Sequence, residues 1–237
     1  MSWESKTDFC GLASGGNATY IQIKGSNENR SSQYLEKLGQ NGEIKATKLY
    51  GTNNASPSCE YTIKKAGDIA VQIGKVTTVD GKRYALQQVV YTSAAGSEPT
   101  LTATAVQIES TTDGEDRMFE EVTLHVDPEE TAQVTLSAAT VSGSGCEITG
   151  ATTTISGTVS PHTVNGDPVS SGVHSGKVEV DLTVGQYDST APTFTAGTNF
   201  ELSQSATVND PDSDMPEWTA KFTKPLELYV ASSGNGS

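Results

Sequence analysis

The chain has 237 residues, which is long enough to bury a core of its own, and it carries a formal net charge of -14 at pH 7. Hydrophobic residues make up 34% of the sequence, aromatic residues make up 6%, and glycine occurs 23 times. This composition excludes a helical bundle and favours many short strands joined by turns. Because no run of about 18 apolar residues occurs, we expect neither a transmembrane helix nor a membrane partner.

The charge is divided unevenly along the chain. Residues 1–90 contain 11 basic and 8 acidic residues, a balance of +3, so the remaining residues carry -17. An acidic half repels a phosphate backbone, so we expect no tight binding of nucleic acid. The opposite signs of the two parts also favour head-to-tail contacts between copies of the chain.

The N-terminal sequence and the cysteines bear on where the protein is made. The first six residues, MSWESK, have neither the basic start nor the apolar stretch of a secretory signal. We therefore expect synthesis in a cytoplasm, from which the protein leaves only by assembly or lysis. Cys10, Cys59 and Cys146 form an odd, widely spaced set without a CxxC motif. This pattern disfavours a disulfide scaffold and a zinc site, and it predicts small buried side chains.

Residues 1–30 are polar and rich in glycine, asparagine and serine, which predicts a flexible N-terminal arm. Tyr20, Ile21 and Ile23 indicate one short strand within it. Such an arm adds little to a monomer but can reach a neighbouring copy. We therefore expect these three residues at an interface.

The best helix signal is the stretch SSQYLEKLG at residues 31–39. A serine can cap its start, and the final glycine can end it in the left-handed conformation. Tyr34, Leu35 and Leu38 lie on one side of this helix. Because a helix of about two turns does not persist alone, we expect this side to dock on a sheet or a neighbour.

Most other segments alternate apolar and polar residues, as half-buried strands do. We expect loops at Gly51–Ser58 and His162–Ser175. About twelve short strands predict an all-β fold, an antiparallel β-sandwich or barrel with one short helix. The main strands expected are Ile44–Tyr50, Tyr61–Ile63, Ile69–Ile73, Tyr84–Val90, Leu101–Ile108, Glu120–Val126, Ala132–Val141, Thr152–Val159, Val178–Val184 and Trp218–Phe222.

Two stretches share the same order of sequence features, a cysteine that opens a strand-like run and a later proline before a short strand, which suggests a duplicated β-module. In the first, Pro99 precedes TLTA, and in the second, Pro192 precedes TFTA. Upstream, Cys59 and Cys146 each open a strand-like run. On this interpretation residues 31–110 form a first β-unit, residues 111–231 form a second, acidic β-unit, and residues 232–237 form a tail. The alternative is that ordinary antiparallel segments resemble each other by chance.

The residues that could carry chemistry form no recognisable constellation. There is no GxSxG, HExxH, P-loop or GxGxxG motif, so we expect no catalytic residue and no cofactor. His162 and His174 lie twelve residues apart without further ligands at metal spacing, and they are better explained as loop histidines. The candidate metal ligands are alternate carboxylates that lack the glycine and glutamate of a calcium loop, so a solvated acidic turn is the simpler interpretation: Asp210, Asp212 and Asp214.

The chain resembles structural proteins of tailed bacteriophages, most of all major tail tube proteins. The resemblance rests on the β-segments Ile69–Ala105 and Gly143–Leu182, the Gly/Ser/Thr-rich surface, the N-terminal arm and the acidity. It implies a non-enzymatic β-sandwich subunit that forms rings of six copies, with inner sheets joined into one barrel and rings stacked into a tube. A duplicated module would give rings of three copies instead. DNA would pass through the acidic lumen without specific binding, in a virion assembled in the host cytoplasm.

Three other functions stay open at this stage. The chain could be a head decoration or tail-tip protein of a virion, which would bind other virion proteins without forming tubes. It could be an immunoglobulin-like bacterial adhesion module, which would require export. An enzyme would need a cleft of converging titratable groups, which the sequence does not indicate.

Overall fold

The structure is a computed structural model that describes residues 9–38, 44–79, 82–108, 117–164, 167–209 and 215–230. In these ranges the chain is mostly antiparallel strand, without any helix of seven or more residues, which confirms the predicted all-β fold. Two short 3₁₀ turns are present, η2 (Gly15–Thr19) and η3 (Thr135–Ser137). The strands are β1 (Ile21–Leu38), β2 (Ile44–Ile63), β3 (Gly67–Val71), β4 (Val76–Val79), β5 (Lys82–Ala94), β6 (Ser97–Ile108), β7 (Arg117–Phe119), β8 (Val122–Val126), β9 (Ala139–Ser142), β10 (Cys146–Val164), β11 (Asp167–Gln186), β12 (Thr193–Ala196), β13 (Glu201–Asn209), β14 (Glu217–Pro225) and β15 (Leu228–Val230).

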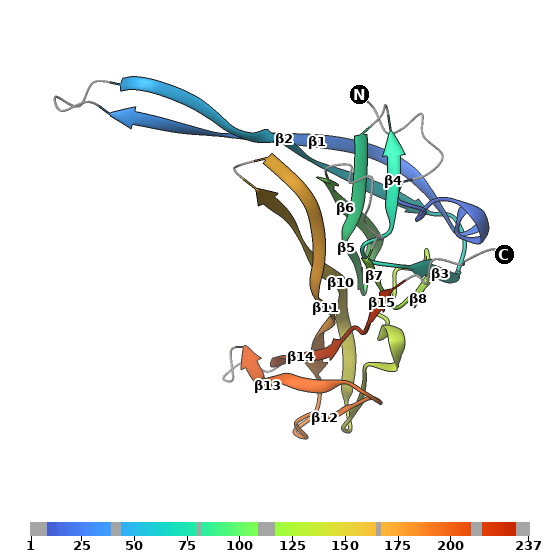
Figure 1. Ribbon diagram of the computed structural model, residues 1–237. Helices are drawn as coiled ribbons and strands as arrows, with labels where there is room; N and C mark the ends of the chain where they lie inside the picture. Colours follow the sequence, from blue (N-terminus) through green and yellow to red (C-terminus); the bar gives the residue numbers. More distant parts are fainter. Residues whose placement is uncertain are drawn as a thin grey trace.

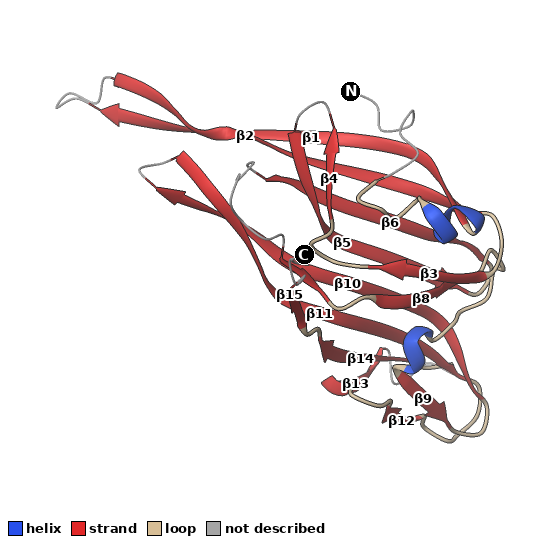
Figure 2. Cartoon of the chain, turned by 45° about the vertical axis from the view of Figure 1, so that its right-hand side comes forward, coloured by secondary structure: helices blue, strands red, loops and turns tan. Residues whose placement is uncertain are grey.

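One large sheet dominates the molecule. Its strands follow the order β1-β2-β6-β5-β10-β11-β14-β13, and β4 pairs with one end of β5. The pairs β3–β8, β9–β12 and β7–β15 form small separate sheets. Figure 2 shows β3 and β8 in front of the large sheet. Ile69, Leu124 and Leu101, all fully buried, belong to one core that lies between these layers.

The order of strands in the large sheet repeats. We call β1, β2, β5 and β6 module one, and β10, β11, β13 and β14 module two. In each module a long hairpin comes first, and the last strand inserts between the hairpin and the third strand, giving the orders β1-β2-β6-β5 and β10-β11-β14-β13. The modules meet where β5 pairs with β10, and we call this pairing the internal junction. It keeps the two modules in one continuous sheet.

The irregularities of the two long hairpins also repeat. The register of β1 with β2 shifts after Ile23, Ser31 and Lys37, and that of β10 with β11 shifts after Ile148, Ser156 and His162. Each position in the second set follows its counterpart by 125 residues. Bulges bend strands and are structural features in their own right, so three shared bulges indicate one module used twice.

The last strands of the modules match with a different spacing. Tyr61 pairs with Leu101 in module one, and Val184 pairs with Trp218 in module two. This equivalence aligns PTLTA at residues 99–103 with PEWTA at residues 216–220. The equivalences predicted from the sequence, Pro99 with Pro192 and Cys59 with Cys146, were therefore wrong. Pro192 precedes the separate strand β12, and Cys146 corresponds to Ile21.

Both long hairpins continue beyond the sheet as two-stranded ribbons, and both leave it on the same side (Figure 1). We call residues 27–38 with 44–57 the first ribbon, and residues 157–164 with 167–176 the second ribbon. The pairing of β10 with β5 ends at Ser156, and that of β11 with β14 ends at Lys177. Beyond these points no other described strand is hydrogen-bonded to the second ribbon.

The helix predicted at residues 31–39 is wrong, because residues 31–38 belong to β1. Tyr34 lies opposite Leu49, Leu35 opposite Lys48, and Leu38 opposite Ile44. A two-turn helix gains few hydrogen bonds for its nucleation cost, whereas a hairpin pairs the whole segment with residues 44–54. The predicted loop Gly51–Ser58 belongs to β2 for the same reason.

Other local predictions also differ from the structure. Residues 9–30 are not a flexible arm, since Phe9 and Leu12 are buried in the core and Ile21 begins the longest edge strand. The predicted loop at 162–175 consists of paired strand up to Val164 and from Asp167 onward. The predicted strand Ala132–Val141 contains the turn η3 before the short strand β9.

The second ribbon bends over an aromatic ring at its base. Gly157 and Gly176 lie at the second bulge of this hairpin, and the ring of Phe119 fills the space beside them. A Cβ atom placed on Gly176 would come within 2.5 Å of Phe119 Cε1. Phe119 is 3% exposed and its backbone N–H donates to Ile73 O at 2.9 Å. The glycines are therefore required by close packing at the bend.

Candidate functional site

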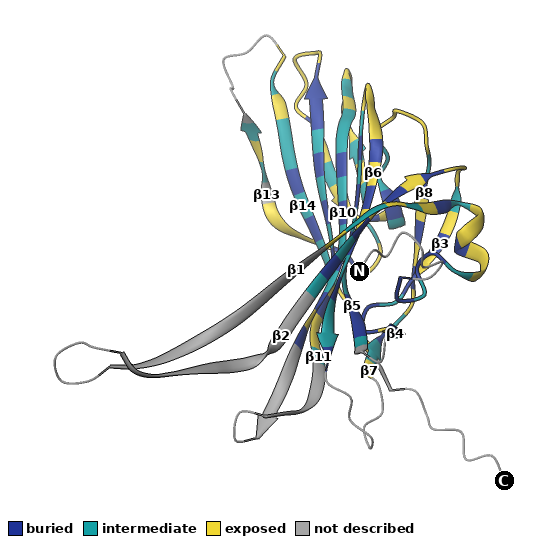
Figure 3. Ribbon diagram, turned by 90° about the horizontal axis from the view of Figure 1, so that it is seen from above, coloured by how far each residue is buried: buried dark blue, intermediate teal, exposed yellow. Residues whose placement is uncertain are grey.

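The two faces of the large sheet differ in character (Figure 3). In β6, Leu101, Ala103 and Ala105 are buried, whereas Thr102 between them is exposed. The other central strands alternate in the same way, so one face is buried in the core and the other is open. We call the central part of that second face, where the strands of both modules pair, the open face.

Hydroxyl groups cover much of the open face. Thr92 and Thr152 share a hydrogen bond of 3.3 Å across the internal junction. Thr207 and Thr219 form a similar bond of 2.9 Å between β13 and β14. Neighbouring hydroxyls thus bind one another, and the surface is polar. The shallow hollows on this face lie at the bends of the two hairpins.

Among the side chains that the structure describes on the open face, carboxylates outnumber ammonium groups by seven to three. The ammonium groups are all paired with carboxylates: Lys24 with Glu60 at 2.9 Å, Lys177 with Glu179 at 2.8 Å, and Lys221 with Asp181 at 3.3 Å. The remaining carboxylates are Glu98, Glu147, Glu201 and Glu217.

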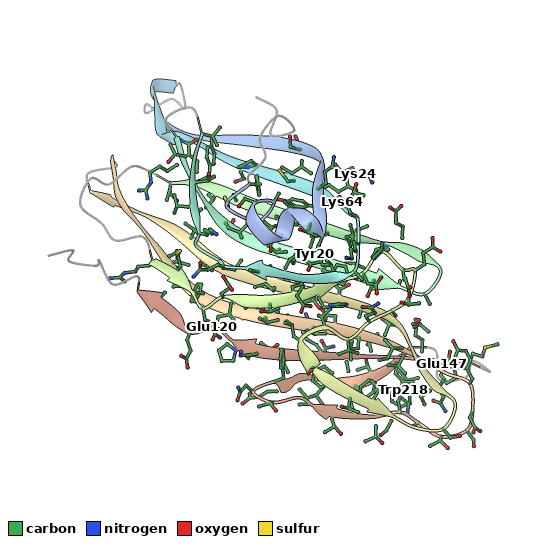
Figure 4. The ribbon with its side chains drawn as sticks, turned by 90° about the vertical axis from the view of Figure 1, so that its right-hand side faces the viewer. Tyr20, Lys24, Lys64, Glu120, Glu147 and Trp218 are labelled. Carbon is green, nitrogen blue, oxygen red and sulfur yellow. The ribbon has the colours of Figure 1, made fainter. Side chains whose placement is uncertain are left out.

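The Lys24 ammonium shows the effect of this surplus. Its hydrogen bond to Glu60 is the largest cause of a raised pKa, followed by the charges of Glu60 and, to a smaller extent, Glu98. Lys24 therefore stays charged and held by carboxylates over the whole physiological range. Figure 4 shows Lys24 of module one and Glu147 of module two toward the same end of the sheet, away from the ribbons.

The sheet ends in two edge strands that have a neighbour on one side only. Among the described strands, β1 pairs with β2 alone and β13 pairs with β14 alone. Backbone N–H and C=O groups on the outer side of such strands are a template for pairing with another chain. The open face and these two edges together form the candidate functional surface.

The predicted interface residues near the N-terminus pack inside the chain. Ile21 is 1% exposed, and Ile23 and Tyr20 are partly buried against the same core. The ring of Tyr20 lies over Gly67, where an added Cβ would come within 2.0 Å of it. Packing in the core explains why these three residues are apolar, so an interface with another chain is not needed to explain it.

The other predicted interface residues lie on the first ribbon. Tyr34, Leu35 and Leu38 are in β1, and their side chains lie outside the described part of the structure. Their role at an interface stays a prediction. The candidate metal ligands Asp210, Asp212 and Asp214 also lie outside the described residues.

The described residues contain no group of three side chains that could hold a metal ion. His174 lies opposite Thr158 in the second ribbon, and its Nδ1 is 3.1 Å from the hydroxyl of Ser175. His125 is exposed on β8 beside Asp68, with Nδ1 2.7 Å from Oδ1. This directly opposed pair of β3 and β8 is a surface contact rather than a site.

The cysteines differ in accessibility. Cys59 is 1% exposed, and burial raises the pKa of its thiol to about 12. Cys10 is buried as well and donates to Tyr84 O at 3.7 Å. Cys146 is half-buried, with its sulfur 3.4 Å from Thr190 O. All three are unbridged, so none contributes a disulfide.

A turn that contains Asp188 lies directly after β11. The backbone N–H of Ser189 and the hydroxyl of Ser144 donate to Asp188, and these bonds lower the pKa of its exposed carboxyl. The hydroxyl and the carboxylate lie on the surface, and their hydrogen bond joins the turn before β10 to the turn after β11.

Comparison of the sequence with known protein families and with curated proteins found no match. Within the described ranges, helical segments are far too short and polar to cross a bilayer. Sequence reasoning missed the open face and the two edges as a unit. The signal was present in the pair IQIKG at residues 21–25 and CEITG at residues 146–150, which mark the same bulge in both modules.

Proposed function

We propose that this protein is a non-enzymatic structural subunit of a tailed-bacteriophage virion and that its copies form the stacked rings of a tail tube. The open face lines the lumen of that tube. The strand edges and ribbons make the contacts between copies. Other virion proteins bind the ends of the tube, and assembly takes place in the host cytoplasm.

One observation carries the proposal: two equivalent modules already lie edge to edge in one sheet whose open face is polar. A monomer has little use for a repeated module that leaves both outer edges of its sheet unpaired. A ring wall needs that arrangement, since each module must offer the same edge to the next. With two modules in each copy, a ring of six modules contains three copies rather than six.

The charges of the open face support passage of DNA rather than its binding. Every lysine named on this face lies beside a carboxylate, so no lysine named there presents an isolated positive charge to a phosphate. The surplus of carboxylates repels a polyanion at short range. A wall of threonine hydroxyls and paired charges lets a duplex slide without sequence-specific contacts.

Two other functions remain as outcomes of the test. A head decoration or tail-tip protein would use the same edges in a single closed ring that does not stack. An adhesion module of the immunoglobulin-like kind would stay monomeric and would need an extracellular partner.

Negative-stain electron microscopy over a concentration series tests the proposal. We expect rings, and tubes at higher concentration, with threefold symmetry in class averages. Rings that never stack at any concentration would favour the decoration or tail-tip function. A dispersed monomer throughout the series would contradict the proposal and leave the adhesion module.

A further inference from the structure

The internal junction shows how one module of this chain pairs with the next. It is antiparallel and runs from Gly150 opposite Ala94 to Ser156 opposite Gln88. On the open face it is closed by the hydrogen bond between Thr92 and Thr152. The strands equivalent to those of the internal junction lie at the outer edges of the sheet, because β13 corresponds to β5 and β1 corresponds to β10.

The strand registers give the residue equivalences at these edges. Because the bulges of β1 and β10 differ by 125 positions, Asn27, Glu28 and Asn29 correspond to Thr152, Thr153 and Thr154. At the other edge, the residues of β13 are matched to those of β5 through their pairing with the last strand of each module, β14 and β6. Thr207 lies opposite Thr219 as Val90 lies opposite Thr102, and Val208 lies opposite Trp218 as Tyr91 lies opposite Leu101.

We propose that β13 of one copy pairs antiparallel with β1 of the next copy, in the register of the internal junction. In that register Thr207 of one copy lies opposite Asn29 of its neighbour, as Val90 lies opposite Thr154 within the chain. Val208 then faces Glu28, and Asn209 faces Asn27. This inference rests on the proposed function for its biological role, but its geometry comes from the internal junction alone.

The partner strand is a second copy of this chain because the two edges are complementary in position and not identical. Pairing β13 with β1 joins the end of module two to the start of module one, so every module gains the same neighbours. Such a head-to-tail contact uses two different patches and closes into a ring when the rotation allows it. Pairing β1 with β1 would instead give a two-fold dimer and leave both β13 edges unpaired.

The composition of β1 fits an edge that must stay soluble before it pairs. Where β10 has Thr153 and the fully buried Ile155, β1 has Glu28 and Arg30. Charged residues on an edge strand disfavour indiscriminate pairing. We therefore expect the contact between copies to be weaker than the internal junction and to form only at high protein concentration.

Engineered cysteines test the register directly. Directly opposed residues of antiparallel strands have Cα atoms about 4.5 to 5.5 Å apart, within the range of a disulfide. The test variant is T207C with N29C in a C146S background, so that the half-buried thiol cannot react. The full chain is oxidised mildly across a concentration series, and its products are separated on a non-reducing gel.

We expect dimers and higher species that end at the number of copies in the ring. The matched control for geometry is V90C with T154C, which should bridge within one chain at every concentration. The control for register is T207C with Q22C, seven residues away along the same edge, which should stay uncrosslinked. Circular dichroism verifies that each variant is folded.

Two results would overturn the inference. The first is the absence of T207C–N29C bridges at concentrations at which V90C–T154C bridges form and rings are visible. The second is efficient dimer formation by the N29C variant alone, which would indicate pairing of β1 with β1. Tubes without the bridge would contradict the register and leave the proposed function intact, whereas bridged rings that never stack would support the register and contradict the tube.

Discussion

The two modules share a pattern of strand pairing and differ in what surrounds it. The first strand of module two, β10, lies inside the sheet and is rich in threonine, with Ile155 fully buried. The first strand of module one, β1, lies at an edge and has the sequence SNENRSS over the corresponding positions. Identity between the two was lost, but all three register shifts remain. The bulges are therefore what the two modules share, whereas the side chains differ with the position of each strand in the sheet.

The ribbons differ in the same way. The second ribbon bends over Phe119, which β7 brings against Gly157 and Gly176. The first ribbon has the same bulge after Ser31, and there β1 pairs only with β2 among the described strands. A two-stranded ribbon alone is marginally stable in water. We expect the contacts of the first ribbon to come from another copy.

The largest expected effect concerns the bend of the second ribbon. F119A removes a fully packed ring and should lower the free energy of unfolding by about 3–5 kcal/mol. G176A forces a Cβ into the same ring and should cost about 1–3 kcal/mol. Urea unfolding followed by circular dichroism measures both changes.

A double variant sharpens this result. In the F119A background the additional change G176A should cost much less than in the wild type, because the clashing ring is absent. G16A is the matched control, since nothing lies within 4 Å of an added Cβ there. Equal costs of G176A in both backgrounds would show that Phe119 does not hold the bend.

The second prediction compares equivalent positions of the two modules. Ile21 and Cys146 both begin the first strand of their module, but Ile21 is 1% exposed and Cys146 is half-buried. I21A should cost about 2–5 kcal/mol, whereas C146A should cost less than about 1 kcal/mol. Similar costs in thermal or urea unfolding would contradict the difference in packing.

The last prediction concerns Cys59, and its effect is absent at neutral pH and appears only in alkali. Its folded pKa is about 12, whereas an unfolded thiol titrates near pH 8.5, so the protonated form is favoured on folding. The stability from this group is fully present below about pH 8.5 and is lost as the pH rises toward 12. The loss is about 1.4 kcal/mol for each pH unit in that window.

Urea unfolding at pH 8 to 11 measures this slope. C59A is the control, because burial also raises the pKa of Tyr91 and the variant isolates the contribution of the thiol. The slope of C59A should be shallower than that of the wild type. In the native state at pH 8, an alkylating reagent should modify Cys146 and leave Cys59 intact, and equal labelling would refute the burial of Cys59.

Part of the fold could be predicted from sequence because it depends on local alternation. The strand predicted at Glu120–Val126 is present as β8 but begins two residues later, and the strands predicted at Ile44–Tyr50 and Val178–Val184 lie within longer ones. The helix at 31–39 could not be rejected locally, since its caps and spacing are those of a helix. Its true state depends on residues 44–54, and pairing between distant segments leaves no mark in a short window.

The candidate surface was harder to predict than the strands. The predicted interface residues Tyr20, Ile21 and Ile23 were chosen for their apolar character, and the core of the same chain uses that character. Residues of the open face, such as Thr92 and Thr152, carry no individual signal, because threonine is common in every strand. Only their alignment across neighbouring strands makes them one surface.

The sequence by itself determined the all-β class, the acidity and the polar character of alternate residues, since each follows from composition or from a period of two. Tertiary structure alone decided which strands are neighbours, which face is buried and which two strands remain at the edges. The physical reason is that backbone pairing is nearly independent of side-chain identity. A strand becomes an edge or a centre through the whole set of its partners, and those partners are distant in the chain: 56 residues separate Gly150 from Ala94, and 113 separate Arg117 from Val230.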